Sequence, residues 1–279
     1  MGIHDQSYRR YAGPRTEPGA AWSVIAWSGI RALLSRRLFL LVLLFAWSQF
    51  VVRAVVFYLS ANFPSMELIA PSAQTFRDFF DQQDFFVFVV TVYAGAGLIA
   101  NDRRANALQI YLAKPLTRAE YVAGKAGVLV VFLLLVTWAP AMLLLVLQTM
   151  FAGSLAFVRE NVFLVPAMTV FALLEVLAAT FAMLALSSLS TSARFAGMLY
   201  AGAILFTTAI FQTVRGVTGS SAASWISFSA NLAQVGDVVF GIAPRHDTPW
   251  GISLLIVVGL IGVSLVVLRW RVRGVEVVT

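Results

Sequence analysis

Six apolar runs, each close to the length of a helix that crosses a bilayer, divide this sequence. We place them at about 38–59, 85–100, 126–150, 162–187, 195–214 and 251–268. A spanning helix needs about 20 apolar residues, and only helices and closed barrels satisfy their own backbone hydrogen bonds in lipid. The runs therefore predict an all-α integral membrane protein whose residues 37–279 form a six-helix transmembrane bundle.

The composition agrees with lipid as the main solvent of the chain. Of its 279 residues, 60% are hydrophobic and 12% are charged, against about 25% charged in a typical soluble domain. The chain has no cysteine, which excludes disulfides and thiolate metal sites. Its two histidines, His4 and His246, are far apart in the sequence. We therefore expect this chain to bind neither a metal nor a cofactor.

The positions of the basic residues predict the orientation in the membrane. Lys and Arg are enriched in the cytoplasmic loops of membrane proteins. With the N-terminus inside, 15 of the 20 Lys and Arg residues fall on the cytoplasmic side, and the other five are Arg53, Arg77, Arg159, Arg215 and Arg245. The net charge of +7 thus reflects topology, and we expect no nucleic-acid partner. The pattern predicts a multi-pass protein of the bacterial inner (cytoplasmic) membrane with both termini in the cytoplasm.

Two segments precede the first apolar run. Residues 1–19 are polar and contain Pro14 and Pro18, so we expect a cytoplasmic tail. Residues 20–36 have helical periodicity, with one apolar face formed by Trp22, Ala26, Ile30 and Leu33. A basic amphipathic helix of this kind typically lies in the membrane interface. The alternative is that it extends the first span into the cytoplasm.

The loop after the second run has a pattern of its own. Residues 101–125 contain an apolar cluster between charged residues, formed by Ala107, Leu108, Ile110, Tyr111 and Leu112. Pro115 is expected to end a short helix at the preceding residue. Thr117 and Glu120 have the spacing of a capping box that begins the next helix. The loop therefore predicts a short amphipathic cytoplasmic helix, a tight turn and a helix that continues into the third span.

These residues resemble the inner loop of the permeases of type-2 ABC exporters. The matching positions are Asp102, Leu108, Leu112, Pro115, Thr117, Arg118, Gly124 and Lys125. Two positions differ from the family pattern, because Asp102 replaces a Glu and Asn106-Ala107 replaces a Gly-Thr pair. The resemblance extends more weakly to three other segments: the N-terminal amphipathic helix is similar to the family's connecting helix, residues 187–197 to its Ser-rich turn, and residues 215–249 to its re-entrant extracellular segment.

The resemblance implies a non-catalytic permease that moves a hydrophobic or amphiphilic substrate outward and works with a separate ABC ATPase subunit. It also implies a dimer with a second permease copy or a homologous permease, with ATP and Mg held by the ATPase. The short cytoplasmic helix would be the coupling helix. The residues implied in ATPase coupling are Asp102, Arg103, Arg104, Leu108, Ile110, Tyr111, Leu112, Pro115 and Arg118.

Missing motifs are consistent with a chain that is not an enzyme. The sequence has no G-x-x-x-x-G-K-[ST] phosphate-binding loop, and no H-E-x-x-H or G-x-S-x-G motif. Any ATP hydrolysis must then occur in a partner. Two other functions fit the same spans: an ATP-independent membrane carrier or channel, and a membrane anchor or assembly factor. Only the exporter requires a stoichiometric ATPase partner.

One carboxyl group falls near the middle of the fourth apolar run. Placing a charge there costs about 2.5–3.5 kcal/mol on insertion scales, so we expect Glu175 to face the bundle, a water-filled cavity or the dimer interface. It would act either as a substrate or proton contact on the transport pathway, or as a structural hydrogen-bonding or protonated group. Arg53 lies nearer the outer end of its span, and its long side chain is expected to reach the headgroups.

The segments expected outside carry aromatic and acidic residues. We expect the phenylalanines Phe76, Phe79 and Phe80 to anchor at the interface and the aspartates Asp78, Asp81 and Asp84 to be exposed, with a metal site on the aspartates as the alternative. Residues 224–241 are amphipathic, and we expect them to lie in or dip into the outer leaflet, as a gate or as a seal.

The orientation can be tested with single cysteines, because the chain contains no other thiol. Ser72→Cys and Ser220→Cys should react with a membrane-impermeant thiol reagent added to intact cells, since both positions are expected outside. Asn106→Cys should react only after the cells are opened. Labelling of Asn106→Cys in sealed cells would reverse the predicted orientation.

Overall fold

A computed structural model of the chain describes residues 21–63, 71–107 and 116–272. These residues form helices and connections, with no strand among them. Six helical segments are long and apolar enough to cross a membrane: Arg37–Asn62, Ala73–Arg104, Arg118–Ala152, Leu164–Leu189, Ala193–Thr218 and Trp250–Arg271. The all-α six-span bundle predicted from the sequence is thereby confirmed.

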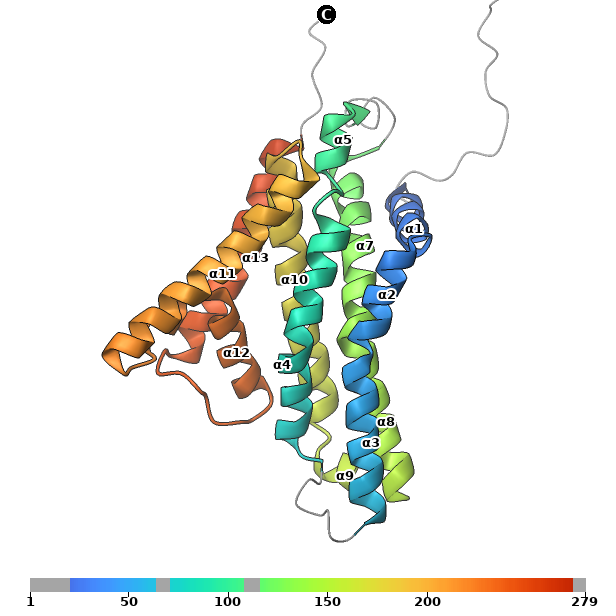
Figure 1. The fold of residues 1–279 in the computed structure, drawn as a ribbon, viewed down its shortest axis with the longest axis vertical. Helices are drawn as coiled ribbons and strands as arrows, with labels where there is room; N and C mark the ends of the chain where they lie inside the picture. Colours follow the sequence, from blue (N-terminus) through green and yellow to red (C-terminus); the bar gives the residue numbers. More distant parts are fainter. Residues whose placement is uncertain (1–20, 64–70, 108–115, 273–279) are drawn as a thin grey trace, which may run out of the picture.

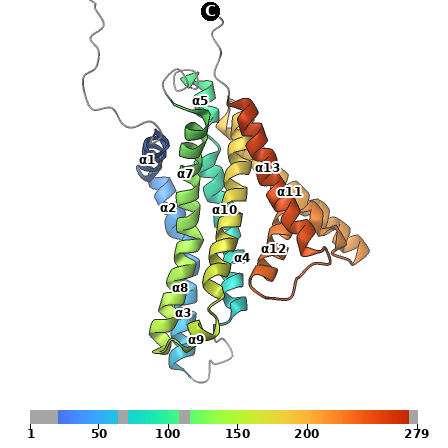
Figure 2. The same ribbon diagram turned by 180° about the vertical axis from the view of Figure 1, so that it is seen from behind.

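The helices follow one another as Figures 1 and 2 show. In chain order they are α1 (Ala21–Leu34), α2 (Arg37–Ala46), α3 (Ser48–Asn62), α4 (Ala73–Val90), the π-helix η2 (Thr91–Gly95), α5 (Ala100–Arg104), α7 (Arg118–Val136), α8 (Trp138–Ala152), α9 (Ala156–Glu160), α10 (Leu164–Leu189), α11 (Ala193–Thr218), the 3-10 helix η3 (Ala222–Ile226), α12 (Phe228–Val239) and α13 (Trp250–Arg271).

Helix α10 is central in this arrangement. It packs against α4, α7, α11, α12 and α13, while the first span, α2–α3, packs along α4 and α7–α8. Helices α11 and α13 diverge from α4 and α10 toward the end of the bundle that carries α9. Helix α12 lies between the α11–α13 pair and the α4–α10 pair (Figures 1 and 2). Following the orientation predicted from the sequence, we call the α9 end the outer end and the opposite end, with α1, α5 and the end of α13, the inner end.

The second span is part of a longer helical segment than the apolar run at 85–100 suggested. Helix α4 begins at Ala73, where Ser72 forms a capping box with Thr75. The first turns were expected to be an outer connection because their residues are polar. Phe76, Phe79 and Phe80 are nearly inaccessible, so the expectation that they anchor at the interface is wrong. They pack with Phe171 and other aromatic side chains in the outer half of the bundle.

The third span is interrupted just before Pro140. Helix α7 ends at Val136 and α8 begins at Trp138, with Thr137 between them. Proline lacks an N–H, and its ring conflicts with the carbonyl four residues earlier, here that of Val136. The Thr137 hydroxyl donates to the carbonyl of Leu133 at 2.9 Å. The interruption therefore has a local cause in the sequence.

The second span is interrupted near its inner end. The π-helix η2 follows α4, and α5 begins after a further turn. The Ser187 hydroxyl of α10 accepts hydrogen bonds from the N–H groups of Ile99 at 3.2 Å and Ala100 at 3.0 Å, and donates to the carbonyl of Ala96 at 2.8 Å. One side chain thus satisfies three backbone groups where the regular helical pattern stops.

Helix α1 is separate from the first span and packs on α7. The chain is extended at Arg36, between α1 and α2, so α1 does not continue the first span. Ala26 and Leu33 of its predicted apolar face are buried, whereas Trp22 is 47% exposed. Close packing depends on Gly124, where an added Cβ would lie 2.7 Å from Ile25 Cβ and 2.8 Å from the Trp22 carbonyl oxygen.

Replacing Gly124 with alanine should therefore separate α1 from α7. We expect Gly124→Ala to lower the free energy of unfolding by about 1–3 kcal/mol, the usual cost of overpacking. The matched control is Gly259→Ala in α13, because no atom lies within 4 Å of its added Cβ. Thermal unfolding of both variants in the same detergent is the measurement. Equal midpoints for the two variants would contradict this account of the α1–α7 contact.

Candidate functional site

The first candidate region, the inner junction, consists of Asp102, Tyr121, Gly124 and Lys125. The Asp102 carboxylate forms an ion pair with Lys125 Nζ at 2.7 Å and accepts a hydrogen bond from the Tyr121 hydroxyl at 2.7 Å. Lys125 Nζ also lies 5.5 Å from the centroid of the Tyr121 ring. The side chains of Asp102 and Lys125 are both largely buried. These contacts fix α5 to α7 at the inner end.

The residues predicted to couple to an ATPase fall into two groups. Leu108, Ile110, Tyr111, Leu112 and Pro115 lie outside the described residues. The remaining four can be placed. Asp102 is engaged within the chain, Arg103 donates to the carbonyl of Ser188, Arg104 is exposed at the end of α5, and Arg118 begins α7.

Two local features of the loop follow from the sequence. Thr117 Oγ1 accepts a hydrogen bond from the Glu120 N–H at 3.2 Å, and Glu120 Oε2 accepts one from the Thr117 N–H at 2.8 Å. The predicted capping box is confirmed. Asn106 has a φ of 52°, a left-handed conformation that glycine and asparagine tolerate best. Asparagine is therefore a suitable residue at this position.

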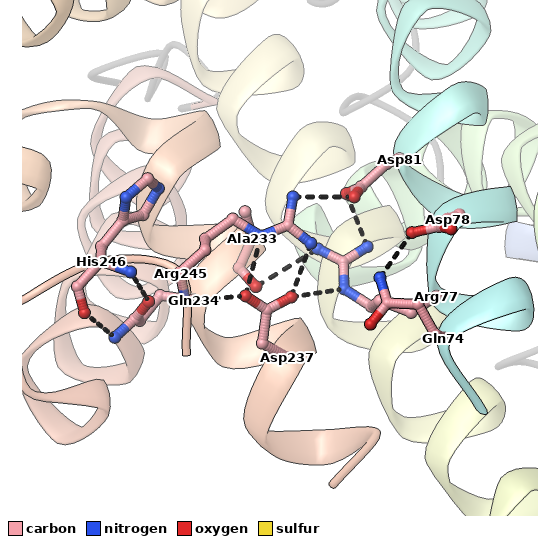
Figure 3. A network of polar contacts seen from close by, with 9 residues as sticks. All are labelled: Gln74, Arg77, Asp78, Asp81, Ala233, Gln234, Asp237, Arg245 and His246. Atoms are coloured by element: carbon pink, nitrogen blue, oxygen red, sulfur yellow. Dashed lines mark hydrogen bonds and ion pairs between the residues drawn. The ribbon is translucent and has the colours of Figure 1, made fainter. Parts of the chain in front are cut away.

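A second candidate region is the outer charge network of Arg77, Asp81, Asp237 and Arg245 (Figure 3). Arg77 pairs with Asp81 at 2.7 Å and with Asp237 at 3.2 Å. Arg245 pairs with Asp81 at 2.8 Å and with Asp237 at 2.7 Å. The side chains of Arg77 and Asp237 are each only 1% exposed. The network joins α4 to α12 and to the connection that follows α12.

The guanidinium of Arg77 is enclosed on its other sides. It donates to the Ala233 carbonyl at 3.2 Å and lies 4.7 Å from the centroid of the Phe171 ring. A Cβ added at Gly236 would lie 2.6 Å from Arg77 Nε and 2.7 Å from a Phe171 ring carbon. Gly236 therefore allows α12 to approach the arginine closely. Buried guanidinium groups need this degree of hydrogen bonding and packing.

The connection after α12 is held by polar contacts as well. The Gln234 amide donates to the carbonyls of His246 at 2.9 Å and Thr248 at 2.7 Å, and it accepts from the His246 N–H at 3.1 Å. Hydrogen bonding to Asp237 raises the pKa of Arg245, although burial opposes it. Burial, followed by the charges of Arg215 and Arg245, lowers the pKa of His246. Hydrogen bonds from Ser221 lower the pKa of the exposed Asp247 carboxyl.

The three aspartates of α4 do not converge on a metal site. Asp78 accepts a hydrogen bond from Gln74 at 2.7 Å, and Asp81 belongs to the outer charge network. Asp84 faces a different cavity. Within the described ranges, no group of three or more His, Asp or Glu side chains is placed to hold a metal ion. The metal alternative raised for these aspartates is therefore not supported by their placement.

The third candidate region is a cavity of about 290 Å³ between α4, α10, α11 and α12, which we call the acidic cleft. Asp84 and Glu175 both line it. Each lies eleven residues after the start of its helix, about 17 Å along the axis. Glu175 is only 2% exposed, while Asp84 is accessible from the cavity. The two carboxyl groups therefore lie on the wall of the same cavity.

Neither oxygen of Glu175 receives a hydrogen bond from an N–H or O–H group of the described chain. The Asp84 carboxyl lines the same cavity, and a contact between two carboxyl groups is a hydrogen bond only if one of them is protonated. Arg53 and Glu175 form no ion pair in the part of the chain described. A structural role for Glu175 would therefore require that one of these two carboxyl groups carries a proton.

Sequence analysis identified Glu175 and Asp102, considered Asp84 only as part of an alternative metal site, and missed Arg77, Asp237 and Arg245 as functional candidates. Arg77 and Asp81 are four residues apart, a spacing that places oppositely charged groups together if the segment is helical. That signal was available once the helix was known to begin at Ala73. The pairing of Arg77 with Asp237, which is 160 residues away, has no local signal.

Comparison with known proteins does not assign a function, so any assignment depends on the residues described above. No protein-family model matches the sequence, and no curated protein gives a match either.

The outer charge network can be tested by removing its most enclosed member. Arg77→Ala should lower the free energy of unfolding by about 3–5 kcal/mol, because Asp81 and the buried Asp237 would then share the single guanidinium of Arg245. Arg77→Lys keeps the charge and should recover part of this loss. Arg159→Ala in α9 is the control, since Arg159 is exposed and forms none of the ion pairs found among the described residues. Unfolding in detergent that is indistinguishable between Arg77→Ala and Arg159→Ala would refute the assignment.

Proposed function

We propose that this chain is the membrane-spanning permease subunit of an ATP-binding-cassette exporter. The observation that carries the proposal is the inner junction. The Asp102–Lys125 pair joins α5, on one side of the predicted coupling segment, to α7, on the other side. A soluble partner that displaces this segment would therefore act on the second and third spans together.

The packing around the junction supports transmission in two directions. Gly124 brings α1 into contact with α7, so movement of α7 would also displace α1. Through Ser187, the start of α5 is bonded to α10, the helix that carries Glu175. Displacement of the coupling segment would thus reach the helices that line the acidic cleft. A shift of rigid, packed helices is a common way to carry such a change.

In this proposal the permease lies in the bacterial inner membrane with its inner end in the cytoplasm. It would act as a dimer, with itself or with a homologous permease, and ATP and Mg would bind to the partner ATPase. The substrate would be hydrophobic or amphiphilic and would move outward. An ATP-independent carrier is the second candidate, because carboxyl groups buried within spans also occur in carriers driven by ions.

The coupling residues can be tested by double substitution. Leu108→Asp combined with Leu112→Asp should release the ATPase subunit, because exposed apolar clusters on cytoplasmic loops serve as contact surfaces and charge would oppose burial there. We expect at least about a tenfold loss of affinity, corresponding to about 1.4 kcal/mol. Copurification from membranes, followed by a binding titration with the purified ATPase, is the measurement.

The control carries the same chemical change at the other end of the bundle. Leu155 precedes α9 and is 57% exposed, so Leu155→Asp should leave ATPase binding unchanged. Unchanged affinity in the Leu108/Leu112 double variant would remove the loop as the docking element. A wild-type chain that purifies without any ATPase and transports in its absence would favour the carrier instead.

A further inference from the structure

We infer that the acidic cleft is a binding site for a lipophilic organic cation, whose charge lies beside Asp84 and Glu175. As a binding site the cleft stands on its own geometry. The statement that its ligand is also the exported substrate rests on the proposed function.

The charges around the cleft are not balanced by the protein. Four carboxyl groups, those of Asp81, Asp84, Glu175 and Asp237, lie in this region with the guanidinium groups of Arg77 and Arg245. Both arginines direct their ion pairs to Asp81 and Asp237. Asp84 and Glu175 thus have no cationic side chain as a direct partner in the described residues. A bound cation would provide the partner that the buried Glu175 carboxylate requires.

The other walls of the cleft favour an organic cation. Four aromatic side chains line it, those of Phe85, Phe88, Tyr200 and Phe228. Phe88 and Tyr200 are stacked, with ring centroids 6.0 Å apart. Aromatic faces attract desolvated cations, and quaternary ammonium groups are commonly bound in this way. A cation with apolar substituents would place its charge in this cavity of about 290 Å³, which is at the small end of ligand pockets.

A metal ion fits these walls poorly. Ca²⁺ takes about six to eight oxygen ligands, and Mg²⁺ needs a nearly ideal octahedral set. The cleft offers two carboxyl groups among mainly apolar and aromatic side chains. A proton shared between Asp84 and Glu175 would neutralise one charge but leave the aromatic walls without a function. The combination of carboxyl groups with aromatic rings is what distinguishes a site for an organic cation.

The cleft can be reached from the side of the bundle. Phe85 and Leu205, which line it, are 65% and 64% exposed, so its rim faces away from the core. Phe88 also lines a second cavity of about 740 Å³, which extends to Asp102 and Lys125. Phe88 therefore lies between the acidic cleft and a cavity at the inner junction.

The test is binding of radiolabelled tetraphenylphosphonium to the full-length chain in nanodiscs, with empty nanodiscs subtracted. We expect saturable binding at one site. Asp84→Asn and Glu175→Gln preserve shape and remove charge, so each should weaken binding by about tenfold or more. Asp78→Asn is the matched control, because Asp78 lies on the same helix and bonds to Gln74 outside the cleft. Its affinity should equal that of the wild type.

Tetraphenylborate provides the matched ligand, since it has the same shape and the opposite charge. It should not displace tetraphenylphosphonium. A further variant, Leu205→Trp, narrows the rim at an exposed position and keeps both carboxyl groups. This variant should also weaken tetraphenylphosphonium binding. If the carboxyl variants do not fold, it tests whether the cation binds in the acidic cleft.

Three results would overturn the inference: no saturable binding to the wild type, equal affinity in the carboxyl variants and the Asp78 control, or displacement by tetraphenylborate. The outcome is independent of the coupling test, because no ATPase is present. If the Leu108/Leu112 double variant binds the cation normally, the inference that the acidic cleft binds a cation is supported, whether or not the loop docks an ATPase. A cation site in a chain that has no ATPase partner would point to a carrier.

Discussion

The arrangement of the outer half depends on one buried ion pair, between Arg77 of α4 and Asp237 of α12. Apolar side chains gain little free energy when they move from lipid into a contact between helices. Polar contacts and close packing therefore hold spanning helices together. Here both ions are almost completely enclosed, and Gly236 provides the space that the guanidinium occupies. The pair places α12 against α4, and thereby supplies one wall of the acidic cleft. Because Arg77 forms its ion pairs with Asp81 and Asp237, it does not pair with Asp84 or Glu175, which line the same cavity.

Local features of the fold were predictable because their causes lie within a few residues. Pro140 interrupts the third span through the carbonyl of Val136, and the Thr117 hydroxyl begins α7 through the Glu120 N–H. The start of α4 was not predictable in this way. Its first turns are polar because they bind other parts of the protein, and a hydrophobicity pattern cannot distinguish such residues from a solvated loop.

In the candidate sites, too, features with local causes were predictable and features that depend on distant contacts were not. Glu175 was identifiable from its depth in an apolar run, but Asp84 was not recognised as its neighbour, since Asp84 was placed in an outer connection. The pair Gly124-Lys125 was recognised only as part of a pattern. The structure gives its two residues separate roles, because the glycine admits α1 and the lysine binds Asp102. Contacts between elements distant in the sequence decide these roles, and no local signal reports them.

The π-helix in the second span has a geometrical consequence for the direction of its acidic side chains. Asp84 and Asp102 are eighteen residues apart, which is five full turns of a regular α-helix. Without an interruption, both carboxyl groups would point the same way. The wider π turn and the break before α5 change the phase of the helix. One span can therefore direct one carboxyl group toward α10 and the other toward α7.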